Sequence, residues 1–305
     1  MDFYLIGQLA AILTSSLWTM NSILFASAGR KIGAISVNAY RIVFAVLFLS
    51  LTHLILFGSL FPNASNQHWL WLGLSGIIGL GIGDFGLFAA FVIIGPRRSV
   101  LIMALSPVFA ALMAFIILNE TLSNFAILGM IVTLVGIIIV IFEREDKSDE
   151  EVISKKLKIW GVFLAFIGAI GQGTGAVFAK KGIYLEASNV INPLSATLIR
   201  MIIAALFIWI CVIIAKKLPD LVNARKNNKG MISTVAGAFL GPFLGVTFSM
   251  VAVTYTKIGI AQTLMSLMPV MIIPILWVLY RQKTSLRGIC GAFIAIIGVA
   301  ILFLI

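Results

Sequence analysis

The chain has 305 residues, of which 61% are hydrophobic and 11% are charged, whereas about a quarter of a typical soluble domain is charged. This composition excludes a soluble globular protein, because apolar runs of the length that crosses a bilayer recur along the whole chain. The formal net charge is +11. Basic residues lie almost entirely between the apolar runs, as topology signals do, so the charge indicates a membrane protein and not a partner of nucleic acid.

Taken in chain order, the apolar runs predict an all-α membrane protein of ten transmembrane helices. The first run lacks a basic flank on its N-terminal side and carries polar residues such as Thr14 and Asn21, which favours a helix over a cleaved signal peptide. The two longer polar connections run from Glu143 to Leu157 and from Lys216 to Gly230. The predicted helices cover residues 3–28, 34–57, 69–94, 98–118, 124–142, 158–180, 191–215, 231–255, 259–280 and 286–305.

An internal duplication is predicted, because the last two helices of each half align without gaps at an offset of 162 residues. The matching positions include Pro107 with Pro269, Gly129 with Gly291, Gly136 with Gly298, Gly79 with Gly241 and Gly83 with Gly245. The predicted repeats are residues 1–142 and 158–305, joined by the charged linker 143–157. Because each half has an odd number of helices, the second must enter the membrane inverted, which predicts a substrate site near the midplane.

Membrane orientation is predicted from the basic residues of the connections. Connections that leave odd-numbered helices hold seventeen Lys and Arg residues, and those that leave even-numbered helices hold three, Lys180, Lys181 and Lys257. By the positive-inside rule the odd connections are cytoplasmic, which places both termini outside and makes this a multi-pass protein of the inner cell membrane.

Several motifs resemble the EamA family of the drug/metabolite transporter superfamily. They are Trp18 in the first helix, Gly83, the Pro107-Val108 pair, the turn from Leu118 to Ser123 that contains Glu120, and Gly136, with Arg41 and Arg200 at the second-helix position of each half. The resemblance covers both halves and implies a ten-helix secondary transporter, in a family whose members export amino acids, nucleotide-related metabolites or drugs.

The sequence departs from that family pattern in three ways. Gln172 stands where the second half would repeat Trp18, and Gln282 stands where it would repeat Glu120. The family is usually drawn with cytoplasmic termini, whereas the charge distribution here favours the opposite orientation.

Three charged residues, Asp84, Arg41 and Arg200, lie about two turns or more inside predicted helices, where each needs a partner or a wet cavity. Asp84 is near the middle of the third helix among glycines, and either couples protons or binds substrate, or it makes a structural bond between helices. Arg41 and Arg200 lie about two turns inside their helices and either snorkel or pair structurally, or hold the anionic group of a substrate. Arg41 and Asp84 would then form a switchable pair, and Arg200 is the better free anion site.

Helix interruption at equivalent places of the two halves is the sequence sign of a midplane site, and the third and eighth helices carry it. The interrupting residues are Gly83, Gly241, Pro242 and Gly245, although tight small-residue packing would use glycines equally well. Polar residues that could line the same cavity are Trp18, Asn21, Tyr40, Gln172, Thr174, Thr247, Tyr255 and Gln262. Glu120 is expected to support the turn or to cap the fifth helix.

The function that these patterns favour is secondary active export or exchange of small organic metabolites, such as amino acids, by alternating access about a central cavity. A channel-like or structural membrane protein is the alternative, and an intramembrane enzyme is a weaker one because no nucleophile-base pair or metal motif occurs. We expect no cofactor, no catalytic residue and no metal site. The expected partners are a small solute, the lipid bilayer and protons as coupling ion, in a monomer or homodimer.

Overall fold

The computed structural model describes residues 3–143, 154–185, 190–280 and 286–304, and every regular element in these ranges is a helix. Ten helical segments within them are long and apolar enough to cross a membrane. The elements are α1 (Phe3–Ile32), α2 (Ala34–Phe57), α3 (Asn66–Ser75), η1 (Gly76–Gly83), α4 (Asp84–Met103), α5 (Ser106–Leu118), α6 (Asn124–Glu143), α7 (Lys155–Ile183), α8 (Pro193–Ile214), α9 (Leu218–Ala224), α10 (Asn228–Ala238), η2 (Phe239–Gly245), α11 (Val246–Tyr255), α12 (Ile258–Met265), α13 (Met268–Tyr280) and α14 (Leu286–Phe303).

The fourth and ninth predicted helices differ from the structure. No break occurs at residues 95–97, where the sequence predicted a connection, and α4 continues to Met103. The prediction was wrong because Gly and Pro end helices in water but are tolerated within membrane bundles. The chain instead leaves helical geometry at Ala104 and Leu105, and the predicted helix 259–280 is divided at Ser266 and Leu267. These two breaks lie at the same offset of 162 residues, so they are equivalent points of the two repeats.

Two π-helical segments widen the third and eighth spans at equivalent places. η1 lies between α3 and α4, and η2 lies between α10 and α11. Gly83 ends the first segment and Gly245 ends the second, which again is an offset of 162 residues. Short π-helical segments commonly mark functional sites, because they leave backbone groups without their usual partners. Both predicted interruptions are thus present as wider helical turns.

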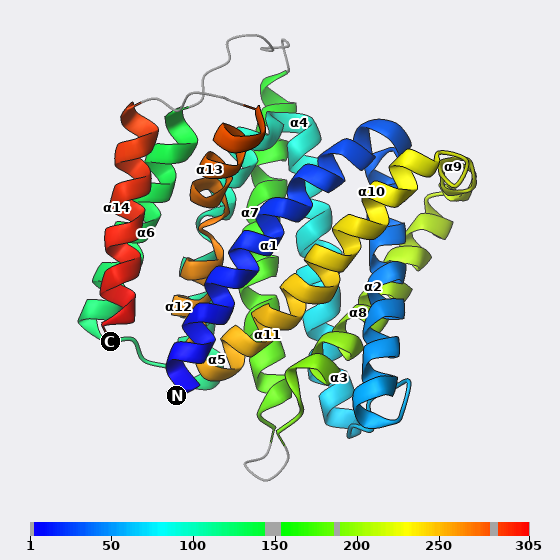
Figure 1. Ribbon diagram of the computed structural model, residues 1–305, viewed down its shortest axis with the longest axis horizontal. Coiled ribbons are helices and arrows are strands. Elements are labelled where there is room, and N and C mark those ends of the chain that lie inside the picture. Colours follow the sequence, from blue (N-terminus) through cyan, green and yellow to red (C-terminus); the bar gives the residue numbers. More distant parts are fainter. Residues whose placement is uncertain (1–2, 144–153, 186–189, 281–285, 305) are drawn as a thin grey trace.

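The inversion of the second half is visible where the fifth span of each repeat meets the other. α6 and α14 lie side by side at one edge of the bundle (Figure 1). A Cβ atom on Gly136 would lie 2.6 Å from the carbonyl oxygen of Gly291, and one on Gly298 would lie 2.8 Å from that of Gly129. Since residues early in α6 face residues late in α14, the two equivalent helices run antiparallel.

The first helix of each half packs against the third span of the other half. α7 contacts α3, η1, α4 and α5, whereas α1 contacts α10, η2, α11 and α12. Figure 1 shows α1 running diagonally alongside α10 and α11 at the front of the bundle. The largest buried core includes Val177, Val253 and Leu264, from three spans of the second half. The halves are therefore interlocked, and a site at the third span is shared between them.

The lipid-facing surface is apolar. Ile55 is 82% exposed and Phe115 is 57% exposed, although both belong to spanning helices. Cys211 and Cys290 are free and exposed on the same surface of the spanning helices.

Replacing Gly136 by Ala is expected to destabilise the α6–α14 contact, because the new Cβ would overlap the backbone nitrogen of Ala295. Overpacking of this kind typically costs about 1–3 kcal/mol. Thermal unfolding of purified protein in detergent would measure the loss. Gly29→Ala is the control, because a Cβ added there would meet no atom within 4 Å, and equal melting temperatures for the two variants would contradict the prediction.

The orientation is tested by cysteine labelling in a Cys211→Ser/Cys290→Ser background. Asn63 and Asn228 are both exposed and lie in connections that the charge rule assigns to opposite sides. An impermeant maleimide added outside cells should label Asn63→Cys at once and Asn228→Cys only after permeabilisation. The reverse pattern would put both termini in the cytoplasm.

Candidate functional site

A buried polar cluster forms around Asp84, where the third span passes between the two halves. Asp84 is the first residue of α4, directly after η1, and is 7% exposed. One carboxylate oxygen pairs with Nη2 of Arg41 on α2, and the other accepts a hydrogen bond of 2.7 Å from Nε2 of Gln172 on α7. The carboxylate thus joins two spans of its own half to the first helix of the other half.

Arg41 is held at several points. Its Nε donates to Oδ1 of Asn38 at 2.8 Å, and its guanidinium lies 5.3 Å and 5.6 Å from the ring centroids of Phe88 and Phe25. Ion-pair, hydrogen-bond and cation–π contacts together compensate a charge inside the bilayer. The snorkelling considered from sequence is therefore not the arrangement found, because the side chain turns toward Asp84.

Glycines bring α7 close enough for Gln172 to reach the carboxylate. A Cβ on Gly171 would lie 2.8 Å from the Cα of Gly83, and one on Gly175 would lie 2.8 Å from the Cα of Gly79. These backbone contacts leave no room for larger residues. Gln172 also lies 3.4 Å from the carbonyl oxygen of Gly79, in the π-helical segment.

Arg200 lies beside the same segment and is poorly partnered. It is 5% exposed, and its Nη1 lies 2.9 Å from the thioether sulfur of Met250. Its Nε has no hydrogen-bond partner within the described part of the chain. A thioether is a weak acceptor, so this guanidinium retains hydrogen-bonding capacity that a carboxylate or phosphate could satisfy. Its Nη2 would lie 3.6 Å from a Cβ on Gly79, which places it next to the Asp84 cluster.

The equivalent place in the second half is apolar. Val246 follows η2 as Asp84 follows η1, at the offset of 162 residues. Here α1 packs against η2, with Trp18 against Gly245 and Asn21 against Gly241, so closely that a Cβ on either glycine would overlap the side chain that faces it. Trp18 and Asn21 thus have the position that Gln172 has in the other half, but no carboxylate of the described residues bonds to them.

Within the described residues, Asp84 bonds to Arg41 and Gln172 and to none of the other polar residues predicted to line the site. The hydroxyl of Thr247 donates to the carbonyl oxygen of Phe243, four residues earlier in the same span. Tyr255 ends α11 and stacks on Phe3, with ring centroids 5.4 Å apart. Tyr40 donates to the carbonyl oxygen of Leu221 at 2.9 Å. Gln262 is buried on α12, and Thr174 is buried on α7. Sequence spacing alone does not distinguish the helix faces that carry these residues from the face that carries Asp84.

A second polar network closes the end of the bundle that holds both termini, and we call it the end latch: Glu120, Thr121, Lys180, Thr256 and Lys257. Oε1 of Glu120 lies 2.6 Å from Nζ of Lys180, which also donates to the carbonyl oxygen of Thr256 at 2.8 Å. Lys257 donates to the carbonyl oxygen of Thr121 at 2.7 Å. The latch joins the turn after α5 to the end of α7 and the start of α12.

Glu120 has a capping role different from the predicted one. Its Oε2 accepts a hydrogen bond of 2.9 Å from the backbone nitrogen of Ile258, the first residue of α12. The fifth span, α6, is capped instead by Ser123, whose Oγ accepts from the nitrogen of Ala126 at 3.1 Å. The prediction assumed a partner near in sequence, but the uncapped helix start that Glu120 reaches lies in the other half.

Comparison with known proteins agrees with this architecture. The model of the EamA-like transporter family matches residues 5–142 and 159–304. The chain belongs to the EamA-like transporter family. Its two family matches coincide with the two inverted repeats, and they place it in the drug/metabolite transporter superfamily. A search of curated protein sequences found no match.

Solved structures add support for the fold of this EamA-like chain. One crystal structure, titled only as that of a protein, superposes with a TM-score of 0.75 at 16% identity and covers 98% of this chain and 96% of its own. A structure of the sodium-calcium exchanger NCX_Mj was also matched, at 18% identity over 98% of this chain and 96% of that one, but its TM-score of 0.18 supports no structural comparison.

Met250 and Lys180 belong to these networks but were not among the residues predicted from the sequence. A methionine in an apolar helix cannot be distinguished from its apolar neighbours by residue type. Lys180 could have been identified, because it is one of three basic residues on the side of the protein that has few of them. All three have partners: Lys180 and Lys257 lie in the end latch, and the Nζ of Lys181 lies 4.0 Å from the ring centroid of Trp71.

The Arg41–Asp84 pair is expected to be energetically coupled. Asp84→Asn keeps the shape of the side chain but leaves Arg41 as an uncompensated charge, which typically costs about 3–5 kcal/mol. Arg41→Met/Asp84→Leu removes both charges and should cost clearly less than the sum of the single variants Arg41→Met and Asp84→Leu. The coupling is measured by chemical unfolding in detergent of the wild type, Arg41→Met, Asp84→Leu and the double variant. Additive losses of unfolding free energy would show that the two side chains do not stabilise one another.

Proposed function

We propose that this EamA-like transporter is a secondary carrier of small organic solutes that bear an anionic group, such as amino acids, and that the cluster around Asp84 is its substrate and coupling site. The observation that supports this most directly is a charged network, buried near the middle of the third span, that joins both halves. Ionisable groups at this depth are costly and usually functional. Inverted repeats place their binding site in this region between the halves.

The charges of the cluster favour an anionic or zwitterionic solute. Arg41 and Asp84 neutralise one another, whereas Arg200 has a thioether as its hydrogen-bond partner. A carboxylate on the solute would supply the acceptors that the guanidinium lacks, in a geometry that suits its planar fork. An ammonium group on the same solute would find Asp84 nearby.

Exchange between two end states would require the halves to separate at one end of the bundle at a time. In this structure the end latch connects the halves at the end that the charge rule assigns to the outside. We propose that the latch is the outer gate, which opens when the halves rock about the cluster. Both oxygens of Asp84 already accept a hydrogen bond, so a substrate ammonium group or a proton bound there would compete with Arg41 and Gln172 for the charge of the carboxylate.

Protons are the proposed coupling ion because Asp84 is the carboxylate inside this cluster. A proton on Asp84 would remove the charge that holds Arg41 and Gln172, so the link between the halves would weaken as the proton binds. Proton uptake and the rearrangement of the spans would then be one event.

Transport is tested with protein reconstituted in proteoliposomes, by uptake and counterflow of a panel of metabolites with and without a pH gradient. We expect a transported amino acid to be displaced by other carboxylates and not by its own carboxamide. Arg200→Gln should lower the affinity for that solute by about 10–100-fold, the equivalent of one lost charged hydrogen bond. Asp84→Asn should still exchange solute but lose acceleration by the pH gradient.

Arg287→Gln is the matched control for Arg200→Gln, since it removes one positive charge from an exposed position at the start of α14. Each variant is used only if it elutes as a single species and has a wild-type melting profile in detergent. Equal inhibition by the carboxamide would contradict the anionic substrate, and full pH-driven transport by Asp84→Asn would contradict the coupling role.

A further inference from the structure

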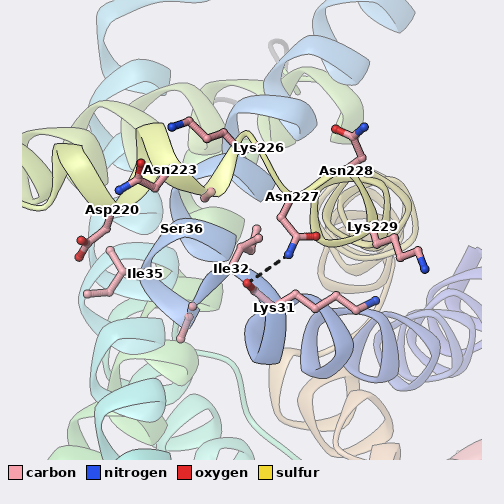
Figure 2. Close-up of a pocket in the computed structure, with 13 residues that line it drawn as sticks. Lys31, Ile32, Ile35, Ser36, Asp220, Asn223, Lys226, Asn227, Asn228 and Lys229 are labelled. Carbon is pink, nitrogen blue, oxygen red and sulfur yellow. Dashed lines mark hydrogen bonds between the residues drawn. The ribbon is translucent and has the colours of Figure 1, made fainter.

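A basic pocket lies at the opposite end of the bundle from the end latch. It has a volume of about 920 Å³ and is formed by the α1–α2 junction on one side and by α9 with the start of α10 on the other. Figure 2 shows Lys31 and Lys229 extending in the same direction on one side of Asn227, with Lys226 and Asp220 on the other side. None of these residues belongs to the polar cluster around Asp84 or to the end latch.

The charge of the pocket is positive and uncompensated. Lys31, Lys226 and Lys229 are exposed, and none of them forms an ion pair with the residues that the structure describes. The one acid of the pocket, Asp220, is paired with Lys217 at 3.2 Å. The pocket therefore offers three ammonium groups to an anion, whose charge would meet no free carboxylate on the lining.

The backbone at the floor of the pocket also favours an anion. Gly33 precedes α2 with φ of 79° and no side chain caps the helix start, so the first amides of a 24-residue helix have no capping acceptor. Ser36, in that first turn, lines the pocket and is 2% exposed, and its hydroxyl makes no hydrogen bond within the part of the chain that the structure describes. A helix start with free amides and a free hydroxyl is a suitable site for phosphate oxygens.

The location of the pocket identifies the source of such a phosphate. α9, which lines the pocket, also exposes Leu218 and Val222, and α8 ends shortly before α9 with Ile214 75% exposed. Apolar side chains that face outward, followed directly by lysines, are typical of the boundary between acyl chains and headgroups. A ligand whose phosphate enters the pocket while its apolar part lies along α8 satisfies both surfaces.

We propose that this pocket binds the phosphate group of an anionic phospholipid, with Lys31, Lys226 and Lys229 around the phosphate and Ser36 and the α2 helix start below it. The lipid would connect the first half to the second at this end. Asn227 already makes a weak connection of the same kind, since its Nδ2 lies 3.5 Å from the carbonyl oxygen of Lys31 while its Oδ1 caps α10 (Figure 2).

Lipid binding is tested by native mass spectrometry of the full chain titrated with phosphatidylglycerol, and with phosphatidylcholine for comparison. Lys31→Gln/Lys226→Gln/Lys229→Gln should lower phosphatidylglycerol affinity by about tenfold or more, as expected for three lysines near an anionic headgroup. The matched control is Lys155→Gln/Lys156→Gln/Lys158→Gln, which removes the same charge from the start of α7 on the same side. It should retain nearly wild-type affinity.

Three results would overturn the proposal. Equal losses in the two triple variants would mean a diffuse basic surface, and equal binding of phosphatidylcholine would mean no selection for anionic lipid. Displacement of phosphatidylglycerol by inorganic phosphate would mean that the pocket takes the free anion. If the lysine variant does not fold, Ser36→Ala provides the test, because it changes no charge. It should lower the affinity for phosphatidylglycerol and leave the affinity for phosphatidylcholine unchanged. An unchanged affinity for phosphatidylglycerol would contradict the proposed site.

Discussion

The structure depends on one constraint, which is that a charge inside the bilayer must find its partners within the protein. Asp84 satisfies it by accepting from Arg41 in its own half and from Gln172 in the other. To make the second contact, α7 must cross against η1, and it can do so only because Gly83 meets Gly171 there. The exchange of first helices between the repeats and the glycines of the third span are therefore parts of one solution.

The π-helical segments belong to the same arrangement. They occur at equivalent positions, but only the first is followed by a carboxylate, since Val246 follows the second. The backbone geometry is thus a property of the duplicated scaffold, and the charges were placed on one copy of it. Arg200 shows the consequence, because it has the second-half position that Arg41 has in the first, yet its hydrogen-bond partner is the sulfur of Met250.

Much of the fold was predictable from the sequence, because the bilayer imposes a length and a composition on each span. The ten spans and the inverted repeat follow from apolar runs, an odd helix number and matched Gly and Pro residues, and the family was indicated by motifs that resemble it, such as the Pro107-Val108 pair; the structure and the family match confirm them. The site was less predictable. Asp84 and Arg41 were identifiable as ions in apolar helices, but nothing in sequence spacing places Gln172 beside them, sends Glu120 to α12 or separates Tyr255 from the centre. Those contacts cross between halves, where distance along the chain carries no information.

The end latch has a consequence for the balance between the two conformations of such a protein. A carrier made of two identical inverted halves would have two end states of equal free energy, since each is the other turned over. Glu120 and Lys180 add a charged contact that connects the halves at one end, and the residue equivalent to Glu120 in the second repeat is Gln282, which cannot form an ion pair. In the alternating-access mechanism proposed above, this divergence of the repeats would favour the end state in which the latch is closed over its inverted counterpart.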